Sequence, residues 1–232
     1  MVRNVTRKQI LLALVSLAAL VTTASVVSHY AGKPEVTVNL KETYPPVIFL
    51  GNQSAKERVT FYWGSNPSSA DAFLKYVVPL YLNGKKSNST AVFLVQYFAN
   101  DKTSGTNSDF FDLRGPGALM FCAPTREAYA KLALEYLASA SDKSRLQSVD
   151  SAKPYLINKA LAELFEKTHI SINDCVNSPG FDRRVRFALG FTEIERTKKG
   201  IGALPVFEYQ HQVFPPSNSA QMRKLEALGL NK

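Results

Sequence analysis

The serines of one short turn are the first residues whose type and spacing could support catalysis. Ser65, Ser68 and Ser69 follow an apolar run at 59–63 and precede a segment with helical periodicity. A serine nucleophile needs an adjacent base and a group that orients this base. No histidine lies close to these serines in the sequence, although His211 could approach them in the folded chain. We therefore interpret Ser68 or Ser69 as the cap of a helix rather than as a nucleophile.

The two cysteines, Cys122 and Cys175, are far apart in the sequence and lack the spacing of metal ligands. The histidines are isolated from the cysteines and from one another; they are His29, His169 and His211. We therefore expect no metal site and no cofactor.

The composition is that of a globular protein with one sizeable domain or two small ones. The 232 residues are 45% hydrophobic and 20% charged, which is sufficient for a buried core. The formal net charge is +9, and the basic residues are scattered apart from two local clusters, Arg183-Arg184-Arg186 and Arg196-Lys198-Lys199. We interpret both clusters as solvated helix faces. Because no basic stripe with interleaved aromatic residues is present, nucleic acid is not an expected partner.

The serine-rich turn lies inside a predicted strand–helix–strand unit. Residues 59–63 are typical of a strand, residues 69–82 have helical periodicity, and 91–97 form an apolar run typical of a strand buried on both faces. Another short strand is expected at 47–50. This order predicts parallel strands joined by a right-handed crossover. The helix would begin directly after the turn, where free N–H groups and partial positive charge are available.

Residues 118 to about 199 are predicted to be helical throughout, and three apolar stripes in this block are interpreted as core packing. The stripes are Tyr129, Leu132, Ala133 and Tyr136; Leu156, Ala160, Leu161 and Leu164; and Phe187, Phe191 and Ile194. A strand at 206–209 and a final helix, capped by Ser217 or Ser219, complete the chain. The whole order predicts an α/β fold with a small sheet that is interrupted by a helical insertion.

The N-terminus has the features of a membrane anchor. Residues 1–8 are basic, and residues 9–27 are almost free of charge and close to the length that spans a bilayer. We expect an uncleaved signal anchor, while small residues at Thr23 and Ser25 leave cleavage as a signal peptide open. Cations before the apolar run place the body of the protein outside the cytoplasm. Residues 28–46 are expected to be a linker.

Four motifs in a fixed order carry a resemblance to a known family. They are the sequence GNQSAK at 51–56, Phe73 and the Val-Val-Pro motif at 77–79 in the first helix, and GIGALPVF at 200–207. With these motifs the chain resembles the DsbA-like, thioredoxin-fold family of extracytoplasmic thiol oxidoreductases. The resemblance covers roughly residues 47–230.

The resemblance implies a thioredoxin-like domain at 47–232 with a helical insertion at about 118–199, preceded by the membrane helix. It also implies a cis proline at Pro205 that faces the turn. Cys122 and Cys175 look like positions where some relatives carry an extra cysteine pair, which favours a structural disulfide in an oxidising compartment. The rival interpretation is a relocated redox pair; neither cysteine is expected to have a helix-start or cationic context that would favour a thiolate.

The catalytic Cys-x-x-Cys motif of that family is absent here. An ungapped alignment puts Pro67 and Ala70 at the cysteine positions, with Ser68 and Ser69 between them. We prefer this alignment because the motifs on both sides of the turn support it; a shift by one residue would put Asn66 and Ser69 there instead. Disulfide exchange needs a thiolate that attacks sulfur and a second thiol that resolves the mixed disulfide. Neither alignment supplies them, so no catalytic residue is expected.

The peptide-binding surface of the family is the part that we expect to remain. It would consist of the turn at 65–70 and the loop with Ala203, Leu204 and Pro205, which could present a backbone edge to an extended peptide. Leu204 replaces the usual Thr or Val and makes this loop more apolar. Trp63 is expected to be a core residue.

The sequence therefore predicts a redox-inactive accessory domain, anchored by residues 9–27 as a single-pass protein of the inner membrane with its body in the periplasm. Signal cleavage, and hence a secreted or periplasmic protein, is the alternative. The expected partner is an envelope protein or an extended peptide. A second hypothesis is a thiol:disulfide oxidoreductase that uses Cys122 and Cys175. A third, weaker one is an exported enzyme built around the serines.

Overall fold

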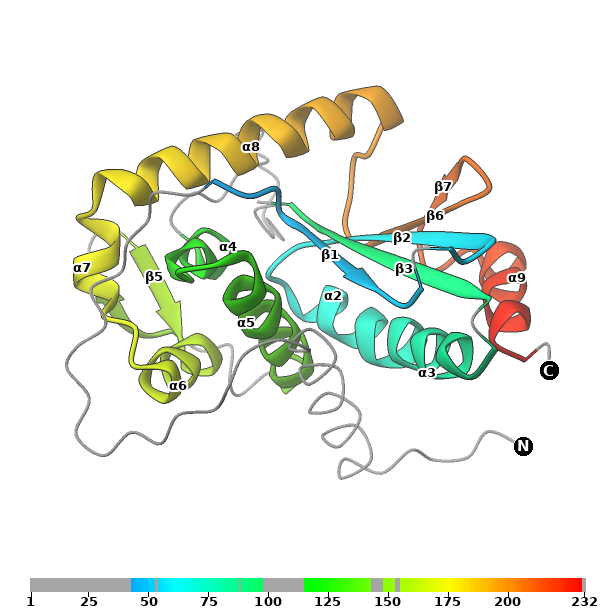
Figure 1. The fold of residues 1–232 in the computed structure, drawn as a ribbon, viewed down its shortest axis with the longest axis horizontal. Coiled ribbons are helices and arrows are strands. Elements are labelled where there is room, and N and C mark those ends of the chain that lie inside the picture. Colours follow the sequence, from blue (N-terminus) through cyan, green and yellow to red (C-terminus); the bar gives the residue numbers. More distant parts are fainter. Residues whose placement is uncertain are drawn as a thin grey trace.

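The computed structural model describes residues 43–52, 54–87, 89–97, 115–142, 148–152 and 155–230. Its larger sheet has the strand order β1-β3-β2-β6-β7 (Figure 1). These strands are β1 (Val47–Leu50), β2 (Glu57–Trp63), β3 (Thr90–Gln96), β6 (Val206–Tyr209) and β7 (Gln212–Phe214). A smaller sheet consists of β4 (Ser148–Ala152) and β5 (Tyr155–Asn158).

The predicted strand–helix–strand unit is confirmed, because β2 and β3 pair in parallel. On either side of this central pair, β1 runs antiparallel to β3 and β6 runs antiparallel to β2. In the latter pair Tyr62 lies opposite Val206. Segments that are far apart in the sequence therefore meet at the carboxyl end of β2, directly before the serine-rich turn.

A continuous helical run connects β2 to β3, and it is longer than the predicted 69–82. It consists of α2 (Pro67–Ala72), a π-helical turn (Phe73–Val77) and α3 (Val78–Ser87). In the wider turn the amide of Val78 donates to the carbonyl of Phe73. Pro79 follows at once, and a proline ring clashes with the carbonyl four residues earlier in a regular α-helix. The π turn gives the ring room at this place.

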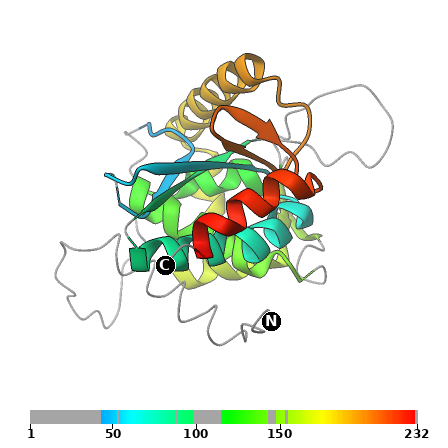
Figure 2. The ribbon, with the colours of Figure 1, turned by 90° about the vertical axis from the view of Figure 1, so that its right-hand side faces the viewer.

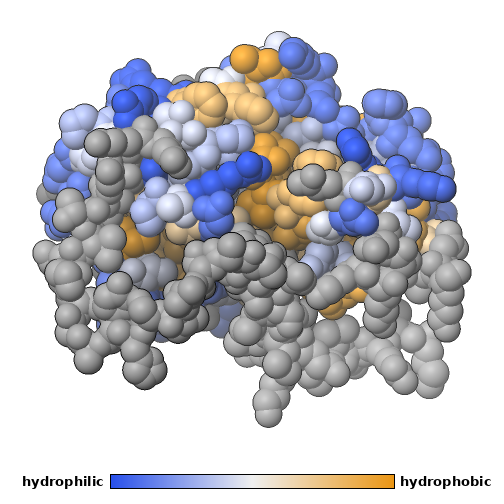
Figure 3. Space-filling model, in the orientation of Figure 1, coloured by the Kyte–Doolittle hydropathy of each residue, from blue (hydrophilic) through white to orange (hydrophobic). Residues whose placement is uncertain are grey.

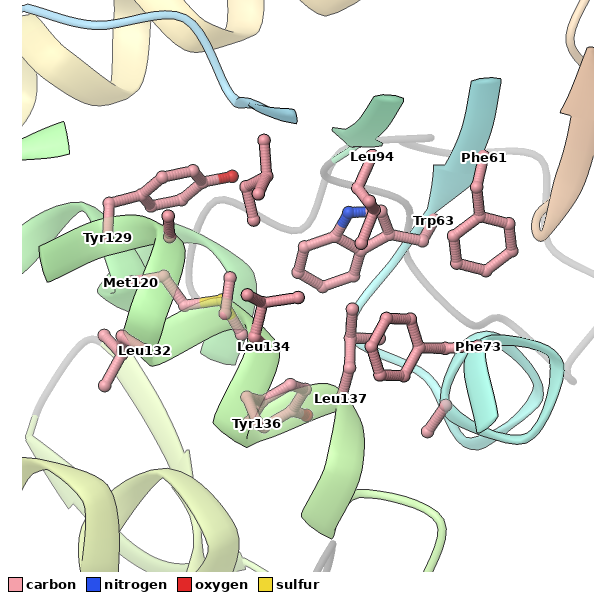
Figure 4. Packing of buried hydrophobic residues seen from close by; sticks show 14 of the residues in the cluster. Phe61, Trp63, Phe73, Leu94, Met120, Tyr129, Leu132, Leu134, Tyr136 and Leu137 are labelled. Carbon is pink, nitrogen blue, oxygen red and sulfur yellow. The ribbon is translucent and has the colours of Figure 1, made fainter. Parts of the chain in front are cut away.

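The helical run and α9 (Ser219–Leu230) cover the same face of the sheet, as Figures 1 and 2 show. Phe61 and Trp63 point from β2 into this core, and both are fully buried. Figure 4 shows the indole of Trp63 between Phe61 and Phe73 on one side and α5 on the other. The prediction that Trp63 is a core residue is therefore confirmed. The cap of α9 is Asn218, whose Oδ1 accepts from Gln221 N–H at 3.2 Å, rather than Ser217 or Ser219.

A second, smaller apolar cluster lies on the opposite face of the sheet, because side chains alternate along a strand. Its buried members are Tyr62, Val95, Tyr97, Ile201 and Val206, and its partly buried members are Val47, Phe191, Leu204 and Val213. This cluster contains residues from α8, from the loop after α8 and from all five strands of the larger sheet. Apolar atoms also reach the surface near the centre of the face shown in Figure 3.

The helical insertion is confirmed in outline, but it is not helical throughout. Its helices are α4 (Pro116–Leu119), a 3-10 turn (Met120–Cys122), α5 (Arg126–Ser139), α6 (Lys159–Thr168), α7 (Ile172–Val176) and α8 (Pro179–Lys199). The β4–β5 hairpin lies between α5 and α6, so Leu156 is in a strand and not in a helical stripe. Asn158 ends this strand and caps α6, since its side chain accepts from Leu161 N–H at 3.0 Å. The stripe that contains Tyr129 and Tyr136 is buried as predicted.

The predicted inward stripe of α8 is wrong. Phe187 and Ile194 are 45% and 55% exposed, and Phe191 is only partly buried. The helix instead turns Arg184, Val185, Ala188 and Thr192 inward. Hydropathy alone would place Phe187 and Phe191 in the core and Arg184 in solvent. The backbone carbonyls of the insertion, however, form a polar site that holds Arg184.

Arg184 is fully buried, which corrects the interpretation of its cluster as a solvated face. Its guanidinium donates to the carbonyls of Phe121 and Ala123, and to that of Pro124 at 2.9 Å. It also lies over the ring of Tyr44, 4.9 Å from the centroid. A buried cation is tolerated where hydrogen-bond acceptors surround it, as these carbonyls do.

The folded body already includes Tyr44, which is 4% exposed and donates to the carbonyl of Ala123 at 2.9 Å. The predicted anchor at 9–27 and most of the predicted linker lie outside the described residues. Within the described part of the chain, no helix has both the length and the apolar character to cross a membrane.

Candidate functional site

The turn between β2 and α2 is closed by Asn66, not by the predicted Ser68 or Ser69. The Oδ1 atom of Asn66 accepts from Ser69 N–H at 2.8 Å. Asn66 is 7% exposed and has an extended backbone, as an N-cap residue should. The side chain at position 66 is therefore the one that meets the free amides at the start of the helix.

Ser69 has a different role, because its Oγ accepts from Gly64 N–H at 3.0 Å and is fully buried. Ser68 is exposed and Ala70 is buried. Pro67 occupies the first helical position, where its missing N–H costs no hydrogen bond. Helix capping and backbone closure account for these polar groups, and no thiol lies among them.

Side chains from the helical insertion hold this turn in place. Tyr136 donates its hydroxyl proton to the carbonyl of Ser65 at 2.9 Å, and Asn158 Nδ2 donates to the Tyr136 hydroxyl at 2.9 Å. Burial raises the pKa of Tyr136 to about 12 in spite of the hydrogen bond from Asn158. The phenol therefore stays a neutral donor at physiological pH.

A second set of buried hydrogen bonds connects the end of β3 to the part of the insertion that lies against the turn. Gln96 donates to the carbonyl of Gly117 at 2.8 Å and accepts from the Tyr129 hydroxyl at 2.8 Å. Gly117 itself lies so close to the turn that a Cβ atom there would be 3.0 Å from Gln96 Nε2 and 3.6 Å from Ser65 Oγ. The insertion thus contacts the turn through both side chains and backbone.

The loop before β6 lies next to the turn. The peptide bond between Leu204 and Pro205 is cis, as the resemblance implied. Because Tyr62 pairs with Val206 in antiparallel strands, the residues before Val206 lie beside those after Tyr62. Pro205 is buried, Leu204 is partly buried, and Ala203 is exposed. The structure therefore brings the two predicted halves of the surface together.

The exposed part of this loop has backbone groups available for a partner. Among the described residues, no backbone hydrogen bond is recorded for Gly202, Ala203 or Leu204, whereas Ile201 N–H donates to the carbonyl of Arg196 at 3.1 Å. Free N–H and C=O groups beside a strand are what an extended peptide needs in order to add to a sheet.

Comparison with solved structures agrees with this arrangement. The thiol-disulfide exchange protein alpha-DsbA2 from Wolbachia pipientis is 11% identical with a TM-score of 0.51, over 83% of this chain and 90% of that one. Oxidised BdbD from Bacillus subtilis is 14% identical with a TM-score of 0.50, over 81% of this chain and 94% of that one. The chain has the DsbA-like thioredoxin fold. No family model and no curated protein matches the sequence.

In this DsbA-like fold the two cysteines lie in the insertion and are bonded to each other. Cys122 and Cys175 form a disulfide with a Cα–Cα distance of 5.5 Å, and both residues are fully buried. Cys122 does have a cationic neighbour, contrary to the sequence-based expectation, because Arg184 donates to the carbonyls on both sides of it. A thiolate must be accessible to attack another sulfur, and neither sulfur is exposed here.

The histidines do not complete a serine-based site within the described residues. His211 lies in the turn between β6 and β7, at the end of the hairpin where Tyr209 pairs with Val59. That is the opposite end of β2 from Ser65. His169 is exposed at the end of α6. The described part of the chain also contains no group of metal-binding side chains large enough to hold an ion.

Sequence reasoning missed two charged residues that flank the loop. Lys199 Nζ lies 2.8 and 2.7 Å from the two carboxylate oxygens of Glu208, and Tyr62 donates to Glu208 Oε2 at 2.6 Å. Burial raises the pKa of Glu208, but the hydrogen bonds from Lys199 and Tyr62 outweigh it and hold this pKa below its ordinary value. Nothing in the sequence indicates that Lys199, at the end of α8, forms an ion pair with Glu208 in β6.

Proposed function

We propose that this chain is a redox-inactive DsbA-like domain that binds an extended segment of a cell-envelope protein. The observation that supports this function best is the juxtaposition of a capped turn without thiols and a cis-proline loop whose residues 202–204 make no backbone hydrogen bond within the described part of the chain. Whether Pro67 and Ala70 or Asn66 and Ser69 stand at the cysteine positions, the turn offers no sulfur for exchange chemistry. What this surface can supply is backbone pairing, and Leu204 adds an apolar contact beside it.

Photo-crosslinking in native membranes tests the binding role. A photoreactive amino acid replaces Ala203 in the full chain, and the same amino acid replaces the exposed Glu226 on α9 as the control. We expect discrete adducts from position 203, none from position 226, and loss of the adducts when Leu204→Asp is added. Equal adducts from both positions would contradict a specific surface.

An insulin-reduction assay tests the redox-inactive part. We expect the full chain to give no turnover above that of the small-molecule thiol alone, because its only disulfide within the described residues is buried. Catalysis by the full chain would overturn the proposal, and loss of this catalysis in Cys122→Ala would then favour the oxidoreductase hypothesis.

We also propose that residues 9–27 hold this domain at the inner membrane, with the domain in the periplasm. The support is the basic segment at 1–8, followed by an uncharged apolar run close to membrane-spanning length. Alkaline extraction of membranes separates the two possibilities: an anchored chain stays in the membrane pellet, and a cleaved chain appears in the supernatant with its first residues missing.

A further inference from the structure

The loop that carries the cis proline is closed at its base by an ion pair. Lys199 is the last residue of α8, and Glu208 is the third residue of β6, so the pair joins the two ends of the connection. Both oxygens of Glu208 are within hydrogen-bond distance of Lys199 Nζ. The side chains of Lys199 and Glu208 are only 26% and 16% exposed, so water screens them less than a surface pair.

A tyrosine joins this ion pair to the neighbouring strand. The Tyr62 hydroxyl donates to Glu208 at 2.6 Å, and the Tyr62 ring stacks on Tyr97 with centroids 5.5 Å apart. Lys199 Nζ lies 5.8 Å from the centroid of the Tyr62 ring and 3.6 Å from Glu195 on the same helix. One carboxylate thus receives three short hydrogen-bond contacts that connect α8, β6 and β2. We call Tyr62, Lys199 and Glu208 the loop clamp.

Backbone contacts fix only the first part of the loop. Gly200 ends α8 in the left-handed conformation, and Ile201 is buried in the second apolar cluster. The backbone groups of Gly202, Ala203 and Leu204 make no recorded backbone hydrogen bonds among the described residues. The position of this exposed edge relative to the turn therefore depends on what holds both ends of the loop.

We infer that Lys199 and Glu208 are positioning residues that hold the Gly202–Leu204 backbone edge in register with the turn at 65–70. This inference rests on the proposed function, and it adds the residues that make the binding edge rigid. A pre-ordered edge binds an extended peptide more tightly, because less loop entropy is lost on binding. Neither residue needs to touch the partner.

Hydrogen exchange of the full chain tests the clamp without any partner. Lys199→Met removes the charge but keeps most of the aliphatic stem, and Lys198→Met is the matched control, since Lys198 is exposed on the same turn. We expect Lys199→Met to raise exchange of the protected amides within 199–209 by roughly tenfold, with β3 unchanged. Lys198→Met should change neither segment, and Lys199→Arg should restore the parent rate.

Two exchange results would overturn the inference. One is unchanged exchange within 199–209 in Lys199→Met. The other is an equal increase in this segment and in β3, because that would show a general loss of stability. The charge-reversed variants add a stricter criterion. Lys199→Glu and Glu208→Lys should each raise exchange when introduced alone, and exchange should return toward the parent rate when the two are combined.

Crosslinking from position 203 then separates the clamp from the proposed function. If the parent gives adducts, we expect Lys199→Met to reduce their yield at a temperature where it is still folded, and Lys199→Arg to retain them. Equal yields from the parent and Lys199→Met would overturn the positioning role while the binding function stands. An absence of adducts from the parent would contradict the binding function, and the exchange experiment would then decide on the clamp alone.

Discussion

The hydroxyl of Tyr136 donates a hydrogen bond to the carbonyl of Ser65 at 2.9 Å, which connects the helical insertion directly to the turn that precedes α2. The same hydroxyl accepts from Asn158, the cap residue of α6. The turn is therefore supported by a residue whose own position depends on two helices of the insertion. These hydrogen bonds indicate that the insertion positions the turn as well as packing against the sheet.

Replacing Tyr136 by phenylalanine should destabilise the protein by about 1–2 kcal/mol, because it leaves the partly buried Ser65 carbonyl and the buried Asn158 amide without their partner. Urea unfolding of the full chain measures the change. The matched control is Tyr81→Phe, since Tyr81 is also buried but has no recorded hydrogen bond with a described residue. We expect a change below about 0.5 kcal/mol for the control, and equal effects would show that the contact with Ser65 contributes nothing.

Removing the disulfide should have a larger effect. The bond closes a loop with a sequence separation of 53, and the chain-entropy model gives about 4 kcal/mol for such a loop. We expect Cys122→Ala/Cys175→Ala to lower the free energy of unfolding by about this amount. Thiol titration of the denatured, non-reduced parent checks the premise, because it should find no free thiol from either cysteine.

Acid should weaken the loop clamp in a defined pH range. The pKa of Glu208 lies below its ordinary value of 4.5, since the hydrogen bonds from Lys199 and Tyr62 outweigh the burial that raises it. Its stabilising contribution is therefore fully present above about pH 4.5 and is lost as the pH falls through the lower folded-state pKa. We expect Glu208→Gln to be about 1–2 kcal/mol less stable than the parent at neutral pH.

Urea unfolding at a series of pH values from neutral to about 3 measures this difference. The gap between the parent and Glu208→Gln should shrink at the acidic end. Glu166→Gln serves as the control, because Glu166 is exposed and its side chain has no recorded hydrogen bond with a described residue. A gap that stays constant over the whole range would show that the charge of Glu208 does not stabilise the fold.

Cysteines introduced at the turn should show which two positions could carry exchange chemistry. Asn66 meets the free amides of the helix, and the Ser69 side chain folds back toward Gly64. We therefore expect Asn66→Cys/Ser69→Cys to reduce insulin at least about tenfold faster than the parent, because a helix start favours a thiolate. Pro67→Cys/Ala70→Cys is the comparison, and activity in this pair alone would support the ungapped alignment.

Much of the fold could be predicted because its signals are local. The apolar runs of β2 and β3 and the helical stretch between them predict a parallel pair, and the pairing of Tyr62 with Val95 confirms it. The β4–β5 hairpin was missed because hydropathy does not separate a short strand from a buried helix. Pro154, which cannot continue a helix, and Asn158, a good cap residue, were the available signals.

The candidate site was predictable only in its location. The sequence order places a turn before a helix and a proline before the last strands, but capping by Asn66 depends on side-chain geometry. The burial of Arg184, a cation, and of Glu208, an anion, could not be predicted for the same reason. Each is a charged residue that becomes partly or fully buried because other residues supply hydrogen bonds. Arg184 donates to the carbonyls of Phe121, Ala123 and Pro124, and Glu208 accepts from Lys199 and Tyr62.

Tyr44 is the residue through which a force along the N-terminal part of the chain would act on the folded domain. Its hydroxyl bonds the carbonyl of Ala123, and its ring lies under Arg184, so the chain is fastened to the insertion just before it reaches β1. If residues 9–27 sit in a bilayer, a pull that reaches Tyr44 along the chain would act on the disulfide-linked insertion. Arg184 and the clamp residue Lys199 both lie on α8, so a load that enters at Tyr44 would also reach the base of the cis-proline loop through this helix.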